Sequence, residues 1–245
     1  INPSIYYKVN VDGTNNLLKC INKNKIKFFI FSSTCAVYGD PLNSMVNELN
    51  STIPISNYAK TKLLSETLIK NYGKKFSMKY AILRYFNVIG ADSKLRSGEV
   101  HKGHLVKNIT SNINKKKYFI NVYGKNYPTK DGTTIRDYID VNDLSTLHIL
   151  SYKKLTRSKS FTLNCGYNTG YSVLDIVKIC ESLIKKRISV KFLPKIKGDI
   201  SKICSDNSLQ KSFFPNWKRK FSIKDSISNT LQWEKTVILK KLTKN

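Results

Sequence analysis

The feature that most constrains the fold is a short apolar run at residues 25–32, which reads K-I-K-F-F-I-F-S. A run of this length and composition is typical of a strand buried on both faces, as in a parallel sheet. The run follows residues 5–23, whose apolar positions recur at helical spacing. A helix followed by a buried strand is the repeating unit of an α/β fold, so we expect this fold class.

The same alternation continues along the chain. Hydrophobic spacing and cap residues predict four further strands and five further helices. The strands are expected at 79–86, 119–123, 160–165 and 188–193, and the helices at 57–72, 105–113, up to about 154, 173–184 and from about 223. No internal repeat or low-complexity linker interrupts this order.

The charge is strongly basic, with 43 Lys and Arg against 16 Asp and Glu, for a formal net charge of +27. Such a balance is compatible with nucleic-acid binding. However, the basic residues are scattered, no nucleic-acid motif accompanies them, and the densest runs, 115–117, 185–187 and 218–220, are three residues long. We therefore expect no specific nucleic-acid partner, although the charge can steer anionic substrates and polyanions toward the protein.

Other classes of protein are disfavoured by what the sequence lacks. No apolar run approaches 18 residues, so we expect no membrane span. The five cysteines are odd in number and form no C-x-x-C, which is typical of reduced thiols in a cytoplasmic protein. His101 and His104 have no supporting carboxylate or cysteine cluster in the sequence, so we expect no metal site there.

Residues 31–62 hold the best candidates for catalysis. Tyr58 is the only tyrosine with a lysine four residues on, Lys62, which on a helix places both side chains on one face. A nearby ammonium favours the phenolate, and a phenolate can act as general base on an alcohol. Thr34, at the carboxyl end of a predicted strand, can relay or orient that proton. The alternative is a surface tyrosine beside a lysine, with strand-end hydroxyls that bond to the backbone.

Two further residues are candidates for ligand contacts. Arg136 can present a bidentate clamp to a phosphate, or it can form a structural ion pair with Asp137. Asp199, directly after Gly198, can accept a hydrogen bond from a sugar or ribose hydroxyl.

Five motifs in order carry a resemblance to a known family. They are F-S-S-T-C-A-V-Y-G, N-Y-A-K-T-K, L-R-Y-F-N-V-I-G-A, D-G-T-T-I-R-D-Y-I-D-V-N-D-L and L-N-C-G-Y-N-T-G-Y-S-V. The chain resembles the extended short-chain dehydrogenase/reductase family of NAD-dependent nucleotide-sugar epimerases, and within it the UDP-glucose 4-epimerases (also called UDP-galactose 4-epimerases). The resemblance covers essentially the whole chain.

The resemblance implies a role for each matching residue. Thr34, Tyr58 and Lys62 would be the catalytic residues and would also contact the NAD cofactor, and Phe86 would flank the nicotinamide. In the implied reaction Tyr58 takes the proton of the sugar 4-hydroxyl while hydride leaves C4 for NAD. The 4-keto sugar then rotates, and hydride returns to its other face. The implied substrate contacts are Asn87, His104, Leu105, Tyr123, Arg136 and Asp199.

The resemblance also implies partners and a domain organisation. The expected substrate is a UDP-hexose, with interconversion of UDP-glucose and UDP-galactose. There are two alternatives: a UDP-arabinose or UDP-xylose 4-epimerase, and a non-catalytic remnant of the fold that binds a nucleotide-sugar. A complete protein would be a homodimer. Residues 1–88 and 133–166 would form the NAD-binding domain, and residues 89–132 and 167–245 a smaller α/β substrate domain.

Two departures from the family pattern modify these expectations. No G-x-G-x-x-G occurs, and no strand precedes residue 5, so we expect a partial Rossmann-like parallel sheet in an N-terminally incomplete chain. Because that loop anchors the NAD pyrophosphate, we expect the chain alone to bind NAD poorly and to be inactive. In addition, Ile196 occupies a position where an arginine would meet the diphosphate, which leaves Lys195 or Lys197 to compensate.

Overall fold

The computed structural model describes residues 3–101 and 103–242, with side chains described up to residue 237. The chain divides into two compact units, each described by itself. The first comprises Ile1–Phe86, Thr146–Asn168 and Ser205–Trp217. The second comprises Asn87–Ser145, Thr169–Cys204 and Lys218–Asn245.

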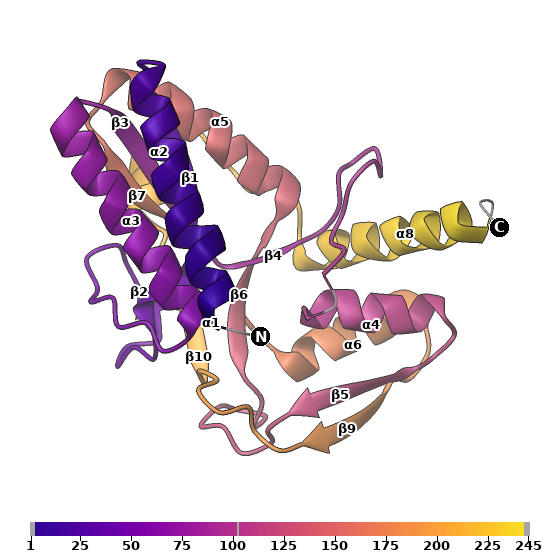
Figure 1. Ribbon diagram of the computed structural model, residues 1–245. Coiled ribbons are helices and arrows are strands. Elements are labelled where there is room, and N and C mark those ends of the chain that lie inside the picture. Colours follow the sequence, from indigo (N-terminus) through magenta and orange to yellow (C-terminus); the bar gives the residue numbers. More distant parts are fainter. Residues whose placement is uncertain (1–2, 102, 243–245) are drawn as a thin grey trace. The chain divides into compact units, whose positions relative to one another are not determined.

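The first unit is built on a parallel sheet of three strands in the order β1-β3-β7 (Figure 1). The apolar run near residue 28 forms β1, as predicted. The strands are β1 (Phe28–Thr34), β3 (Lys79–Tyr85) and β7 (Phe161–Cys165); the helices are α1 (Pro3–Tyr6), a π-helical segment (Tyr7–Asp12), α2 (Gly13–Lys23), a 3₁₀ turn (Cys35–Tyr38), α3 (Asn57–Phe76), most of α5 (Val141–Arg157) and α7 (Ser208–Phe213). The short strand β2 (Met45–Val46) lies between the 3₁₀ turn and α3.

The helices α2 and α3 lie side by side against the sheet (Figure 1). Apolar residues from the two helices and from β1 and β3 form one core cluster. Its buried members are Leu18, Ile21, Phe31, Ile69, Met78 and Ile82. The cluster packs the second half of α3 on the sheet, with Ile69 as its buried member from this helix. The candidate catalytic residues Tyr58 and Lys62 lie in the first two turns of the same helix.

The second unit contains two smaller sheets. In one, β6 pairs in parallel with β4 and β10 and antiparallel with β8; in the other, β5 and β9 form a parallel pair. The strands are β4 (Asn87–Ile89), β5 (Phe119–Tyr123), β6 (Ile135–Asp140), β8 (Gly170–Ser172), β9 (Ser189–Leu193) and β10 (Lys202–Ser205); the helices are α4 (Leu105–Asn114), α6 (Val173–Ile184) and α8 (Ile223–Leu242). A core of isoleucines and valines, including Ile109, Ile176 and Ile227, joins these elements.

The expected α/β class with parallel sheets is confirmed. The compact units differ from the expected domains chiefly at residues 133–145 and 205–217, and by two residues each at 87–88 and 167–168. Residues 133–145 belong to the second unit because β6 pairs with β4 and β8 there. Residues 205–217 belong to the first unit because α7 packs on β7, with the Phe213 and Phe161 rings 5.1 Å apart. None of the described helices is long and apolar enough to cross a membrane.

Candidate functional site

Thr34 and Tyr58 meet at the carboxyl end of β1. Thr34 is the last residue of the strand, and Tyr58, in the first turn of α3, is hydrogen-bonded to its side chain. Ser56 caps this turn by accepting a hydrogen bond from the backbone N–H of Ala59 at 3.1 Å. The ring of Tyr6 meets the Tyr58 ring edge-on, with centroids 6.1 Å apart. The structure thus brings the predicted hydroxyl and phenol together.

Lys62 lies one helical turn beyond Tyr58, and its ammonium rests over the Phe31 ring, 4.0 Å from the ring centre. Burial lowers the pKa of Lys62 to about 8, against the opposing effect of the Glu66 carboxylate. Burial also raises the pKa of Tyr58, against the hydrogen bond with Thr34. The expected lowering of the Tyr58 pKa by Lys62 is therefore not found, because burial of the phenol outweighs the interactions that favour its ionised form.

A buried ionic network supports the turn of α3 that carries Lys62. Glu66 is fully buried and accepts hydrogen bonds from Arg84 Nε at 3.0 Å, from Arg84 Nη2 at 2.7 Å and from the Ser33 hydroxyl at 2.6 Å. The Glu66 carboxylate holds the pKa of Arg84 above its ordinary value in spite of burial. The sequence analysis did not identify this pair, because neither partner belongs to a short motif that predicts an ion pair across α3 and β3.

Asn10 attaches α3 to the π-helical segment. Its Nδ2 donates to the Thr61 hydroxyl at 2.9 Å, and its backbone carbonyl accepts from the Ser65 hydroxyl at 2.9 Å. π-Helical turns are frequent at functional sites, and this one is hydrogen-bonded to the helix that presents Tyr58 and Lys62. The sequence contained no periodicity that distinguishes a π-turn from the surrounding α-helix.

A second hydroxyl pair lies next to Thr34 on the sheet. Tyr85 is the strand partner of Thr34, and its hydroxyl donates to Ser32 at 2.6 Å and contacts His148 Nε2. Burial raises the pKa of Tyr85 to about 12. The sequence analysis missed Tyr85 and His148, because they are 63 positions apart and only the packing of α5 against the sheet joins them.

The second unit contains a pocket of about 260 Å³ that gathers five of the six predicted substrate contacts. Its polar lining comes from the start of β4, the N-terminus of α4, β5, β6 and the loop at Asp199, and its apolar lining includes Ile120, Val122 and Val173. The five predicted residues are Asn87, Leu105, Tyr123, Arg136 and Asp199.

Arg136 and Asp199 form the charged part of this pocket. Arg136 Nη2 lies 2.6 Å from Asp199 Oδ1, and the Tyr127 hydroxyl donates to Asp199 Oδ2 at 3.3 Å. Arg136 therefore pairs with Asp199 and not with its sequence neighbour Asp137, the alternative that the sequence left open. Asp199 thus orients the guanidinium that would meet a phosphate.

Ile196 lines the same pocket, whereas Lys195 is not among its described lining residues. Lys195 Nζ donates to the backbone carbonyl of Asn126 at 2.6 Å and lies 4.4 Å from the centre of the Tyr127 ring. Among the described residues that line this pocket, Arg136 is therefore the only lysine or arginine.

His104, the sixth predicted contact, does not line this pocket. Its Nδ1 is 2.7 Å from Glu99 Oε2, and its side chain is 61% exposed. The other carboxylate oxygen of Glu99 accepts from the backbone N–H of His101 at 2.6 Å. Glu99 therefore holds this loop in place, an interaction that the sequence analysis did not anticipate. Among the described residues, no group of three or more His, Cys, Asp or Glu is arranged to hold a metal ion.

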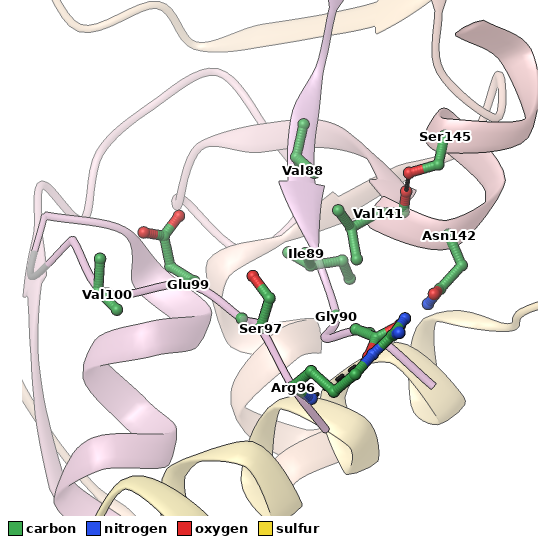
Figure 2. A pocket seen from close by; sticks show the side chains of 12 residues that line it. Val88, Ile89, Gly90, Arg96, Ser97, Glu99, Val100, Val141, Asn142 and Ser145 are labelled. Carbon is green, nitrogen blue, oxygen red and sulfur yellow. Dashed lines mark hydrogen bonds and ion pairs between the residues drawn. The ribbon is translucent and has the colours of Figure 1, made fainter. Parts of the chain in front are cut away.

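A larger pocket of about 720 Å³ lies beside β4 and the start of α5 (Figure 2). Its polar side chains are already bonded within the unit. Arg96 pairs with Asp92 at 2.6 Å, the Asn142 amide donates to the Ala91 carbonyl at 2.9 Å, and the Ser145 hydroxyl donates to the Val141 carbonyl at 2.8 Å. The larger pocket contains none of the predicted substrate contacts, whereas the smaller pocket gathers five of them and is the better candidate for a charged ligand.

The chemistry of the first unit fits the nicotinamide end of a dinucleotide. Tyr58 and Lys62 supply a hydroxyl and an ammonium of the kind that binds ribose hydroxyls, and Thr34 adds a second hydroxyl beside them. Phe86 directly follows β3, and only 4% of its surface is exposed. Its backbone N–H donates to the Cys165 carbonyl at 3.2 Å, which fixes the end of the strand.

Comparisons with known proteins agree with this arrangement. The profile of the NAD dependent epimerase/dehydratase family matches residues 1–166. The UDP-glucose 4-epimerase of Halalkalibacterium halodurans is 32% identical over 237 residues, which are 95% of this chain and 71% of that protein. The UDP-arabinose 4-epimerase 1 of Arabidopsis thaliana is 33% identical, and the match spans 95% of this chain and 57% of that protein.

Solved structures give the same result. The UDP-glucose-4-epimerase of Stenotrophomonas maltophila, solved with NAD and formylated UDP-arabinopyranose, superposes with a TM-score of 0.91 at 31% identity, over 97% of this chain and 72% of that one. The Bifidobacterium longum UDP-glucose 4-epimerase, solved with NAD⁺ and UDP, has a TM-score of 0.89 at 32% identity, over 96% and 71% of the two chains. The predicted resemblance to NAD-dependent epimerases is therefore confirmed: the chain belongs to the NAD dependent epimerase/dehydratase family.

Proposed function

We propose that this chain carries the proton-transfer site and the nucleotide-sugar pocket of a UDP-glucose 4-epimerase. The observation that carries the proposal is the hydrogen bond between Tyr58 and Thr34 at the carboxyl end of β1, with Lys62 one turn further along the same helix. A protein that only binds a nucleotide-sugar has no need of a phenol and an ammonium held in this way.

Tyr58 is the proposed base, which removes the proton of the sugar 4-hydroxyl and returns it after the 4-keto sugar has rotated. Thr34 orients the phenol through their hydrogen bond. Lys62, one turn further along α3, is the proposed ribose-binding group. NAD, when bound, supplies the acceptor and donor of hydride for C4 of the sugar. Phe86 is the proposed neighbour of the nicotinamide.

The pocket of the second unit is the proposed UDP site. Arg136, oriented by Asp199, is suited to a diphosphate, and the apolar residues beside it are suited to a pyrimidine ring. Asn87, Leu105 and Tyr123 line the same pocket and are proposed as further contacts. His104 is proposed as a contact only after it leaves Glu99, since the two are paired at 2.7 Å.

The decisive experiment measures conversion of UDP-glucose to UDP-galactose by the protein expressed from its own gene. Replacing Tyr58 by Phe should lower kcat by roughly 10²- to 10⁴-fold, the range for loss of a general base. Tyr6→Phe, which keeps the ring beside Tyr58, is the matched control and should leave the rate within about twofold. Unchanged activity of the Tyr58→Phe variant would rule out the proposed base.

The choice of sugar is tested with the same protein. UDP-glucose, UDP-arabinopyranose and UDP-xylose are compared by kcat/KM, because relatives of both kinds resemble the chain at similar identity. A larger kcat/KM for a pentose would establish the arabinose/xylose alternative. Tight UDP binding without turnover of any of the three would establish a non-catalytic remnant.

We also infer a homodimer in the cytoplasm. Apolar side chains on the outer faces of the helices of the first unit support the dimer: Val9, Leu17 and Leu64 are 64%, 49% and 43% exposed. Leu17→Glu and Leu64→Glu should shift the sedimentation coefficient to that of a monomer, whereas Leu42→Glu, in an exposed loop, should not. The five free cysteines support a reducing compartment.

A further inference from the structure

The fold brings together two basic runs that are far apart in the sequence. The first run, residues 115–117, follows α4 and precedes β5; the second, residues 185–187, follows α6 and precedes β9. β5 and β9 are parallel, with Phe119 opposite Ser189, so both runs enter the sheet from the same end (Figure 1). The Ser189 N–H donates to the Tyr118 carbonyl at 2.9 Å, and Lys186 Nζ lies 4.9 Å from the centre of the Tyr118 ring.

The result is a cationic cluster, a name we use for six exposed side chains at this end of the β5–β9 sheet. They are Lys115, Lys116, Lys117, Lys185, Lys186 and Arg187. A shallow depression of about 340 Å³ adjoins the second run and is lined in addition by Lys178. Glu181 is the carboxylate at this depression; it lies 3.6 Å from Arg187 and also accepts from the Ile188 N–H. One carboxylate among these cations leaves a large net positive charge.

Helix ends alone do not explain this concentration of charge. A cation near a helix C-terminus is stabilised by the helix dipole, which accounts for a lysine or two after α4 and after α6. Six cations in two adjacent runs instead repel each other. Moreover, the segments 115–125 and 182–198, which contain the runs and their strands, include no Asp or Glu.

An exposed aromatic ring accompanies the cluster. Phe119 is 46% exposed and begins β5 two residues after Lys117. Aromatic side chains beside a positively charged surface are the combination that binds single-stranded nucleic acids, by stacking with bases and by contacts to phosphates.

We propose that the cationic cluster, with Phe119 beside it, binds single-stranded nucleic acid without sequence specificity. The phosphates lie along the two basic runs, and a base stacks on the Phe119 ring. This binding is independent of the proposed UDP pocket, because the pocket lies toward the other end of β5, at Tyr123, and contains Arg136 and Asp199. The absence of a sequence-reading motif agrees with binding that depends on charge and stacking.

The test is fluorescence anisotropy with a labelled oligodeoxycytidylate of twelve nucleotides, in saturating UDP, using the protein expressed from its own gene. Each phosphate contact contributes about 0.7 to the slope of log K against log salt for single strands. Replacing the three lysines of the first run by Gln should therefore lower the slope by about 2 and weaken binding at 0.1 M salt at least tenfold. The corresponding change of residues 185–187 should act similarly.

The matched control removes the same number of charges from the third basic run. Gln at residues 218–220 changes the net charge equally, and those residues lie outside the β5–β9 sheet. Equal losses in the control and in the cluster variants would overturn the proposal in favour of net charge alone. Phe119→Leu, which keeps an apolar side chain without the π-face, should weaken single-strand binding about fivefold or more.

Two further outcomes reject the assigned ligand. Tighter binding to a duplex of the same length would contradict base stacking on Phe119. The second outcome concerns vesicles that contain phosphatidylserine. If the cluster variants abolish vesicle binding but leave oligonucleotide binding unchanged, the cluster binds an anionic membrane surface. Loss of oligonucleotide binding in the cluster variants, with the control unchanged, would support the proposal.

Discussion

Lys62 places its ammonium 4.0 Å from the centre of the Phe31 ring, on the side of α3 that covers the end of β1. The position is half-buried, and burial lowers the pKa of Lys62 to about 8 from 10.5. The packing of the first unit therefore partly desolvates the Lys62 ammonium. This placement has a consequence for how stability depends on pH.

We expect Lys62 to make the unfolding free energy rise with pH between about 8 and 10.5. In that interval the unfolded chain binds a proton at this lysine that the folded chain has released, so stability increases as the pH rises. Urea unfolding from pH 7.5 to 9.5 measures the effect below the ordinary titration range of the tyrosines. Lys62→Met should remove this part of the slope of unfolding free energy against pH, whereas Lys60→Met, at an exposed lysine, should retain it. Parallel curves of unfolding free energy against pH for wild type and Lys62→Met would contradict the expectation.

The ion pair of Glu66 and Arg84 should be among the most sensitive contacts of the first unit. Glu66→Gln leaves the guanidinium buried without a counter-charge, which should cost about 3–5 kcal/mol of unfolding free energy. Chemical denaturation measures the loss. Ser33→Ala, which removes one hydrogen bond to Glu66, should cost only about 1–3 kcal/mol.

A double variant separates the charge from the packing at the same place. Glu66→Gln combined with Arg84→Met removes both ionic groups and should be more stable than Glu66→Gln alone. If the double variant loses the sum of the two single losses, the two side chains do not act as a pair.

The N-terminus of α6 provides a second stability prediction. Ser172 forms a capping box with Asp175, in which each side chain accepts from the other residue's backbone N–H, and its hydroxyl also bonds to Asp131. Ser172→Ala should cost about 1–2 kcal/mol. Ser56→Ala, at the simpler cap of α3, is the comparison and should cost less, about 1 kcal/mol. Thermal unfolding of both variants gives the order, and a larger loss for Ser56→Ala would contradict it.

Arg136 should dominate UDP affinity in the proposed pocket. Arg136→Lys retains the charge but loses the planar pair of donors, and we expect binding about tenfold or more weaker by isothermal titration with UDP. Lys195→Gln is the control, because Lys195 is bonded to Asn126 at the pocket edge, and should change affinity by less than about threefold. If the Lys195 variant loses more affinity than the Arg136 variant, the diphosphate lies elsewhere.

The fold class and the order of the main elements follow from the amino-acid sequence alone. The apolar run at β1 and the helical spacing around it leave few alternatives to a parallel sheet, because four consecutive apolar strand residues, Phe28 to Phe31, need cover on both faces. Tyr58 and Lys62 were identifiable for a similar reason: a separation of four residues on a helix fixes their common face without knowledge of the rest of the fold.

The environment of those two residues, in contrast, depends on the three-dimensional packing. The sequence predicted that Lys62 would lower the Tyr58 pKa, but the packing of α3 on β1 partly desolvates both side chains, which raises the pKa of Tyr58, and directs the ammonium to Phe31. The Glu66–Arg84 pair, the contact of Tyr85 with His148 and the cationic cluster join residues from separate elements. Their meeting depends on strand register and helix packing, which no local pattern encodes, whereas the helical spacing of Tyr58 and Lys62 is encoded locally.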